Sequence, residues 1–133
     1  MASRESQLAA LADAAVRAVA GQDEAAQVVR ACGLPGPPAE VVMIAAGRCA
    51  RRYHRQEAAV EAMTVDPELE PYRQALGRYV AYHLVLVRAA VDLACAGDPG
   101  TYRARSSLEG LGPPADDLRR LHEELLLMTA LAV

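Results

Sequence analysis

The segment RYVAYHLVLVRAAVDLACA, residues 78–96, is apolar enough to lie in a protein core, yet it contains a histidine, an arginine and an aspartate. On a helix with about 3.6 residues per turn, His83 falls among the apolar side chains. Arg88 and Asp92 fall together on the opposite side of the same helix. We therefore predict a helix over residues 71–96 with one buried face. On its polar side, Arg88 and Asp92 are expected to form an ordinary surface pair.

Glycine and proline divide the rest of the chain into further helices. These positions are Gly21, residues 33–38, residues 66–67, residues 97–100 and residues 110–114. We expect Ser3 to cap the first helix and Asp23 to cap the second. A short helix is expected over residues 102–109. Because no window alternates apolar and polar residues as a strand does, we predict an all-α fold. It would be a compact bundle of five or six helices, three of them long, in a single domain over residues 1–133.

Composition restricts the function. Net charge is −3 and the isoelectric point about 5.6, which disfavours nucleic acid as a partner. All 14 basic residues are arginine, and Ile44 is the one isoleucine, a bias typical of a high-GC bacterium. Three cysteines, an odd number without a CxxC motif, favour reduced, buried thiols and a cytoplasmic location. The longest apolar run is interrupted by charged residues, so we expect no membrane span.

His83 is the first candidate functional residue because it faces the apolar side of its helix. A buried imidazole needs hydrogen-bond partners, since burying it without them costs about 1–3 kcal/mol. The partner could be a tyrosine hydroxyl, a backbone carbonyl or a water, which would make His83 a core residue. It could instead be a ligand in a cavity between helices. Tyr79 and Tyr82 lie beside His83 on the same helix. His122, at the edge of the apolar stripe of the last helix, could line the same cavity.

A row of arginines in GRCARRYHR, residues 47–55, is the second candidate. Arg48, Arg52 and Arg55 are spaced to lie on one side of a helix, with Arg51 at their flank. No acid stands three or four residues from any of them, so this helix supplies no ion-pair partner. Acids of other helices, such as Asp116 or Asp117, could do so. Otherwise the row would bind phosphate, a carboxylate or an acidic peptide, because guanidinium groups hold such groups bidentately.

The last helix carries a third feature. Leu127 and Leu131 fall on the face that otherwise carries Arg and Glu residues. Large aliphatic side chains on a polar face favour a partner, so we expect self-association through this helix or through the first helix. The alternative is that the first helix of the same chain covers these leucines.

The sequence leads to three functional hypotheses. The first is a small cytoplasmic helical binding or accessory protein, expected to be homodimeric, that holds a small anionic molecule or an acidic peptide segment. The second is a small cofactor-independent enzyme of specialised metabolism, with His83 as general base and Tyr79 beside it. The third is a regulatory protein that docks on a protein partner. No metal-binding motif or cofactor-binding motif is present, so we expect no metal and no cofactor.

Overall fold

A computed structural model of the chain describes residues 2–96, 104–105 and 107–132. The helices are α1 (Arg4–Ala20), α2 (Gln22–Cys32), α3 (Glu40–Glu61), α4 (Glu70–Cys95) and α6 (Pro113–Leu131). No strand occurs in these described ranges, so the predicted all-α class is confirmed. Of the short helix expected over residues 102–109, residues 104–105 are helical and residues 107–109 are not, and the other three positions lie outside the described residues.

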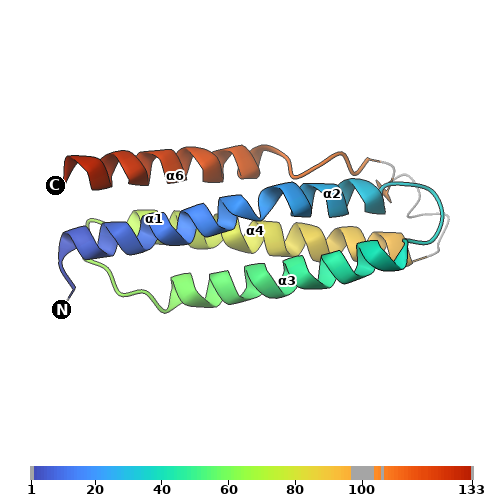
Figure 1. Ribbon diagram of the computed structural model, residues 1–133, viewed down its shortest axis with the longest axis horizontal. Coiled ribbons are helices and arrows are strands. Elements are labelled where there is room, and N and C mark those ends of the chain that lie inside the picture. The colour runs from blue at the N-terminus through green and yellow to red at the C-terminus, as the bar shows by residue number, and fades with distance from the viewer. Residues whose placement is uncertain (1, 97–103, 106, 133) are drawn as a thin grey trace.

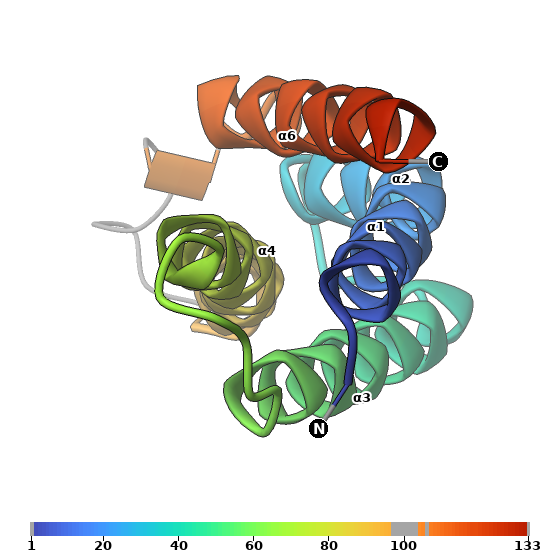
Figure 2. The same ribbon diagram turned by 90° about the vertical axis from the view of Figure 1, so that its left-hand side faces the viewer.

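The helices run alongside one another along the length of the molecule (Figure 1). α1 and α2 follow each other along one row, with Gly21 between them. Seen end-on, α3 and α6 lie on opposite sides of the molecule, separated by α4 on one flank and by the α1–α2 row on the other (Figure 2). α3 packs mainly on α4, and α1 packs mainly on α6. When α1 and α2 are counted as one packed unit, the described residues form four such units, so the expected count of five or six helices is not matched exactly.

Local signals explain most helix ends. Ser3 caps α1 as predicted, because its hydroxyl accepts a hydrogen bond from the Ser6 N–H at 3.1 Å. The prediction that Asp23 caps α2 is wrong. The capping position is Gly21, and Asp23 lies inside the first turn, where its charge still suits the helix dipole.

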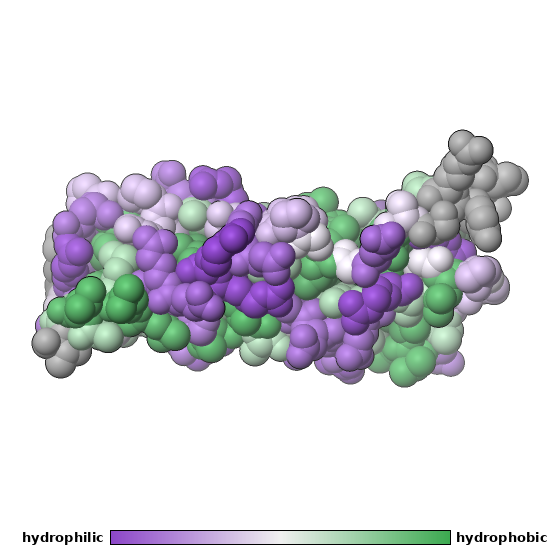
Figure 3. Space-filling model, turned by 90° about the horizontal axis from the view of Figure 1, so that it is seen from above, coloured by the Kyte–Doolittle hydropathy of each residue, from purple (hydrophilic) through white to green (hydrophobic). Residues whose placement is uncertain are grey.

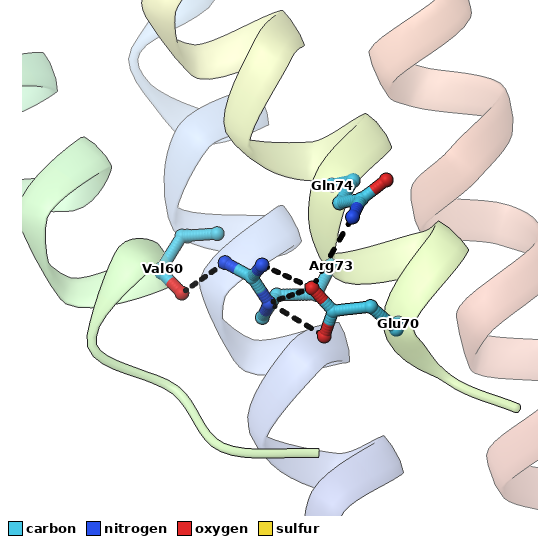
Figure 4. A network of polar contacts seen from close by, with 4 residues as sticks. All are labelled: Val60, Glu70, Arg73 and Gln74. Carbon is cyan, nitrogen blue, oxygen red and sulfur yellow. Dashed lines mark hydrogen bonds and ion pairs between the residues drawn. The ribbon is translucent and has the colours of Figure 1, made fainter. Parts of the chain in front are cut away.

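The start of α4 is tied to the end of α3 by a small polar network (Figure 4). Arg73 binds both carboxylate oxygens of Glu70, and its Nη1 donates to the Val60 carbonyl of α3 at 3.5 Å. Gln74 also donates to Glu70, at 3.4 Å. The cation therefore covers a carbonyl near the C-terminus of α3, where positive charge is favourable. The same arginine lowers the pKa of Glu70.

The apolar face predicted for α4 is confirmed, with Leu76, Val80, His83 and Val87 all buried. Two expectations for the same helix are wrong. Arg88 and Asp92 are exposed, but they form no ion pair with each other. Cys95, at the last turn, is exposed, whereas the other two cysteines are buried as expected. Within the part of the chain that is described, no helix is long and apolar enough to cross a membrane.

Candidate functional site

Two of the functional candidates, His83 and Arg52, lie at the junction between α1 and α2. Gly21 stands at this junction, and a Cβ atom placed there would come within 3.2 Å of both the Arg52 Nη1 and the Tyr53 hydroxyl. Glycine therefore allows α3 to approach the junction closely. The residue after it, Gln22, is buried and points to α4 and α6. One short stretch of chain thus contacts three other helices.

His83 is fully buried beneath this junction, with 0% of its surface exposed. Its Nδ1 lies 2.6 Å from the Tyr79 carbonyl oxygen, and its Nε2 lies 3.0 Å from the Gln22 Nε2. A carbonyl can only accept, so Nδ1 carries the proton and Nε2 accepts from the Gln22 amide. The same amide nitrogen donates to the Ala115 carbonyl at 3.0 Å. The imidazole is therefore neutral, with both nitrogens engaged.

Two tyrosine rings enclose this imidazole. The Tyr53 ring centroid lies 5.2 Å from that of His83, and the Tyr82 ring meets it edge-on at 5.8 Å. Their hydroxyls point elsewhere: Tyr53 donates to the Ala18 carbonyl at 3.2 Å, and Tyr82 donates to the Leu111 carbonyl at 2.7 Å. Tyrosine thus surrounds His83 through ring faces and edges, while a carbonyl and an amide satisfy its nitrogens.

This geometry favours a packing role for His83. A general base needs a free nitrogen within reach of its substrate, and neither ring nitrogen is free here. Tyr79 contributes its backbone carbonyl, and its side chain lines a separate surface hollow between α4 and α6 with Tyr72 and Arg120. The catalytic roles of His83 and Tyr79 stay predictions. His122 is half-buried, and no hydrogen bond or ring contact joins it to His83 within the described residues.

Sequence analysis missed Gln22, which completes the buried network. A signal was present, because Gln22 shares its helix face with Ala25, Val29 and Cys32, all of them buried. A polar residue on such a face needs partners in the same way as His83 does. The amide nitrogen of Gln22 has two partners, but the Gln22 Oε1 is buried with no hydrogen-bond partner among the described residues.

The four arginines of residues 48–55 fall into two groups. Arg48 forms a fork with Glu24 of α2, with Nε–Oε1 and Nη2–Oε2 distances of 3.2 and 2.9 Å. Glu24 also accepts from the Cys49 thiol at 3.1 Å. These bonds lower the pKa of Glu24, and burial together with this carboxylate raises the pKa of Cys49 to about 12. Arg48 is thus a structural link between α2 and α3, and Cys49 is a protonated thiol at neutral pH.

The other three arginines form no ion pair within residues 2–96, 104–105 and 107–132. Arg51 and Arg55 are exposed, and Arg52 is half-buried beside Gly21. The acids suggested as partners do not reach them. Asp116 and Asp117 instead pair with Arg119 and Arg120 on their own helix, one turn away. We call Arg51, Arg52 and Arg55 the arginine row from here on.

Replacing Gln22 with leucine should destabilise the fold by about 1–3 kcal/mol, because His83 Nε2 and the Ala115 carbonyl would both lose their buried donor. Urea denaturation would measure the change. The matched control is Gln56→Leu, since Gln56 Oε1 is also buried but already unpartnered. Gln56→Leu should cost less than Gln22→Leu. Equal losses would show that the Gln22 amide adds nothing to stability.

The stability of the protein should fall as pH drops below about 6.5. Burial lowers the pKa of His83 from its ordinary value of 6.5, so the unfolded chain takes up this proton first as the pH falls. Each pH unit then costs up to about 1.4 kcal/mol, until the folded imidazole protonates as well. Above that pH range the His83 imidazole is neutral in both the folded and the unfolded chain, so it contributes no pH dependence.

Urea denaturation at several pH values between about 5 and 8 tests this linkage. His83→Leu should flatten the pH dependence, whatever its effect on absolute stability. Gln56→Leu, which removes no ionisable group, should keep the parental slope. An unchanged slope in His83→Leu would contradict the linkage.

Comparison with known proteins adds no functional assignment. A scan against protein-family models, a search of curated proteins and a search of solved structures each returned no match. The functional interpretation therefore rests on the chemistry of this chain's own side chains.

Proposed function

We propose that this protein is a helical binding protein that holds an anionic ligand, either a small molecule or an acidic peptide segment, on the arginine row. The observation that supports this proposal is the set of three guanidinium groups on one stretch of α3 without an ion pair among the described residues. Arg48, one turn earlier, is already bound to Glu24. It would anchor the helix, and the three remaining arginines would contact the ligand.

Electrostatics support the same function. Like charges one turn apart on a helix repel each other, and a bound anion relieves that repulsion. The guanidinium fork matches carboxylate and phosphate groups, so two adjacent arginines can hold one anion through several charge-assisted hydrogen bonds. The chain as a whole is acidic, with a net charge of −3. A local basic row on an acidic protein favours a compact anionic group over a long polyanion such as nucleic acid.

The enzyme hypothesis receives less support from the geometry. It required His83 as a general base, and the hydrogen bonds to Tyr79 and Gln22 occupy both nitrogens of that ring. The regulatory hypothesis overlaps with the first, because a partner protein could present the acidic peptide segment.

The double variant Arg51→Gln, Arg55→Gln should weaken the binding of a fluorescein-labelled oligoglutamate peptide by about tenfold or more, since two charge-assisted contacts are lost. Both side chains are exposed, so the fold should be retained. Fluorescence anisotropy at low and at physiological ionic strength measures the affinity.

The matched control for this experiment is Arg17→Gln, Arg78→Gln, which removes the same charge from exposed positions on α1 and α4. It should keep most of the parental affinity. Equal weakening in both double variants would mean that the peptide responds to net charge alone, and the arginine row would then lose its assignment.

Self-association is a second part of the proposal, and it concerns the end of α6. Leu126, Leu127 and Leu131 are 49%, 61% and 77% exposed, so the first helix of the same chain does not cover them. Seen from the α6 side, apolar side chains gather at the end of the molecule where α6 ends (Figure 3). We propose that a second copy covers these leucines in a symmetric dimer, since adjoining aliphatic side chains at a helix end favour burial.

Replacing both Leu127 and Leu131 with serine should shift the protein from dimer to monomer at micromolar concentration, because the buried apolar contact is lost. Size-exclusion chromatography with light scattering measures the mass. Val85→Ser is the control, because Val85 is 64% exposed but lies on α4. A parent protein that is monomeric throughout the accessible concentration range would contradict this part of the proposal.

A further inference from the structure

A surface hollow of about 260 Å³ lies between α3 and α4. Its apolar lining comes from Met43, Ala46 and Ala50 of α3 and from Val87 and Val91 of α4. Gly47 completes the α3 side, and Arg88 and Asp92 stand at the α4 border. Mostly apolar lining with two charged groups at the rim is the usual composition of a binding hollow.

Gly47 connects this hollow to the arginine row. A Cβ atom placed on Gly47 would lie 3.4 Å from the Arg51 Nη1, and it would meet no other atom within 4 Å beyond its chain neighbours and the nearby backbone of its own helix. The guanidinium of Arg51 therefore lies beside Gly47, which lines the hollow, while Arg55 lies one turn further along α3. The absent side chain of Gly47 keeps the space beside Arg51 open. A ligand bound at the row would meet an apolar recess next to its anionic group.

The size of the hollow distinguishes between the two ligand classes in the proposed function. Sites for small organic ligands usually enclose about 300–1,000 Å³ and bury most of the ligand. This hollow is smaller than that range, so it suits one apolar side chain better than a whole small molecule. The arginine row extends beyond it along the helix, with Gly47 and Arg55 about 12 Å apart. A ligand that reaches both must be extended, as a peptide is.

We infer that the anionic ligand is a peptide segment of a partner protein, which carries acidic residues for Arg51 and Arg55 and one apolar residue that enters the hollow beside Gly47. This inference rests on the proposed function and narrows it. Charge complementarity supports it: Arg88 adds a cation to the lining of the hollow, whereas Asp92 on the same helix repels acids from its side. The acidic residues of the peptide are thereby directed toward α3, which would fix the direction of binding.

Three fluorescein-labelled peptides of roughly ten residues test the inference, a length that spans the distance whether helical or extended. The first has several glutamates and one central leucine. The second has alanine in place of the leucine, and the third keeps the leucine but has glutamine in place of every glutamate. The parent protein should bind the leucine peptide about tenfold more tightly than the alanine peptide, and the glutamine peptide should bind weakest.

The variant Gly47→Leu should remove the preference for leucine, because its own side chain would fill the hollow. It should fold, since the one nearby atom is the end of the flexible Arg51 side chain, and leucine is a better helix former than glycine. Gly77→Leu is the matched control. Gly77 lies on α4 beside a different hollow, and a Cβ placed there meets only the Val60 side chain, at 3.7 Å. This control should keep the preference.

Each outcome separates the inference from the function on which it rests. Equal binding of the leucine and alanine peptides, or a leucine preference that survives in Gly47→Leu, overturns the inference and leaves the arginine row as an anion site. If inorganic phosphate binds the parent protein, as measured by titration calorimetry, while neither acidic peptide binds, the ligand is a small anion and the inference is wrong. If neither the acidic peptides nor phosphate binds the parent protein at low ionic strength, the proposed function fails as well.

Discussion

The hydrogen bonds from Gln22 to His83 and to the Ala115 carbonyl are the contact on which the centre of the bundle depends. They join α2, α4 and α6 through one amide nitrogen between buried side chains. Inside a protein such bonds are strong, and an unpaired group is costly, so the network admits few alternative packings. It also fixes the protonation of His83, because a protonated ring would face the amide donor with a second donor. The buried network thus specifies both the arrangement of helices and the charge of the core.

Near the same junction, one arginine of α3 forms an ion pair and the arginines that follow it remain available to a ligand. Glu24, two residues after Gln22, binds Arg48 and the Cys49 thiol, which holds α3 against α2. With that carboxylate engaged, the next arginines along α3 lack a carboxylate partner in the described residues. Because Glu24 holds α3 at Arg48, the arginines that follow keep a fixed arrangement along the helix. Preorganised cations of this kind bind an anion at a lower entropic cost than flexible ones do.

Much of the fold could be predicted from periodicity and from helix-ending residues. The buried faces of α4 and α6, the cap at Ser3 and the breaks at Gly21 and Gly33 were all visible in the sequence. The inward direction of His83 was also visible, because its place among the aliphatic residues follows from helical geometry alone. The hydrogen-bond partner of His83 was not visible in the sequence, since Gln22 lies 61 residues away. Sequence spacing along one helix carries no information about which residue of another helix lies opposite.

The sequence by itself determined the helical class, the faces that are buried and the row of arginines without acids on its own helix. These are local properties, set by side-chain spacing along a rigid repeat. Only the tertiary structure decided that His83 is enclosed by Gln22 and two tyrosine rings, that Glu24 takes Arg48, and that Gly47 opens a hollow beside Arg51. Those outcomes depend on which helices become neighbours and at what register, and that is fixed by the packing of the whole core.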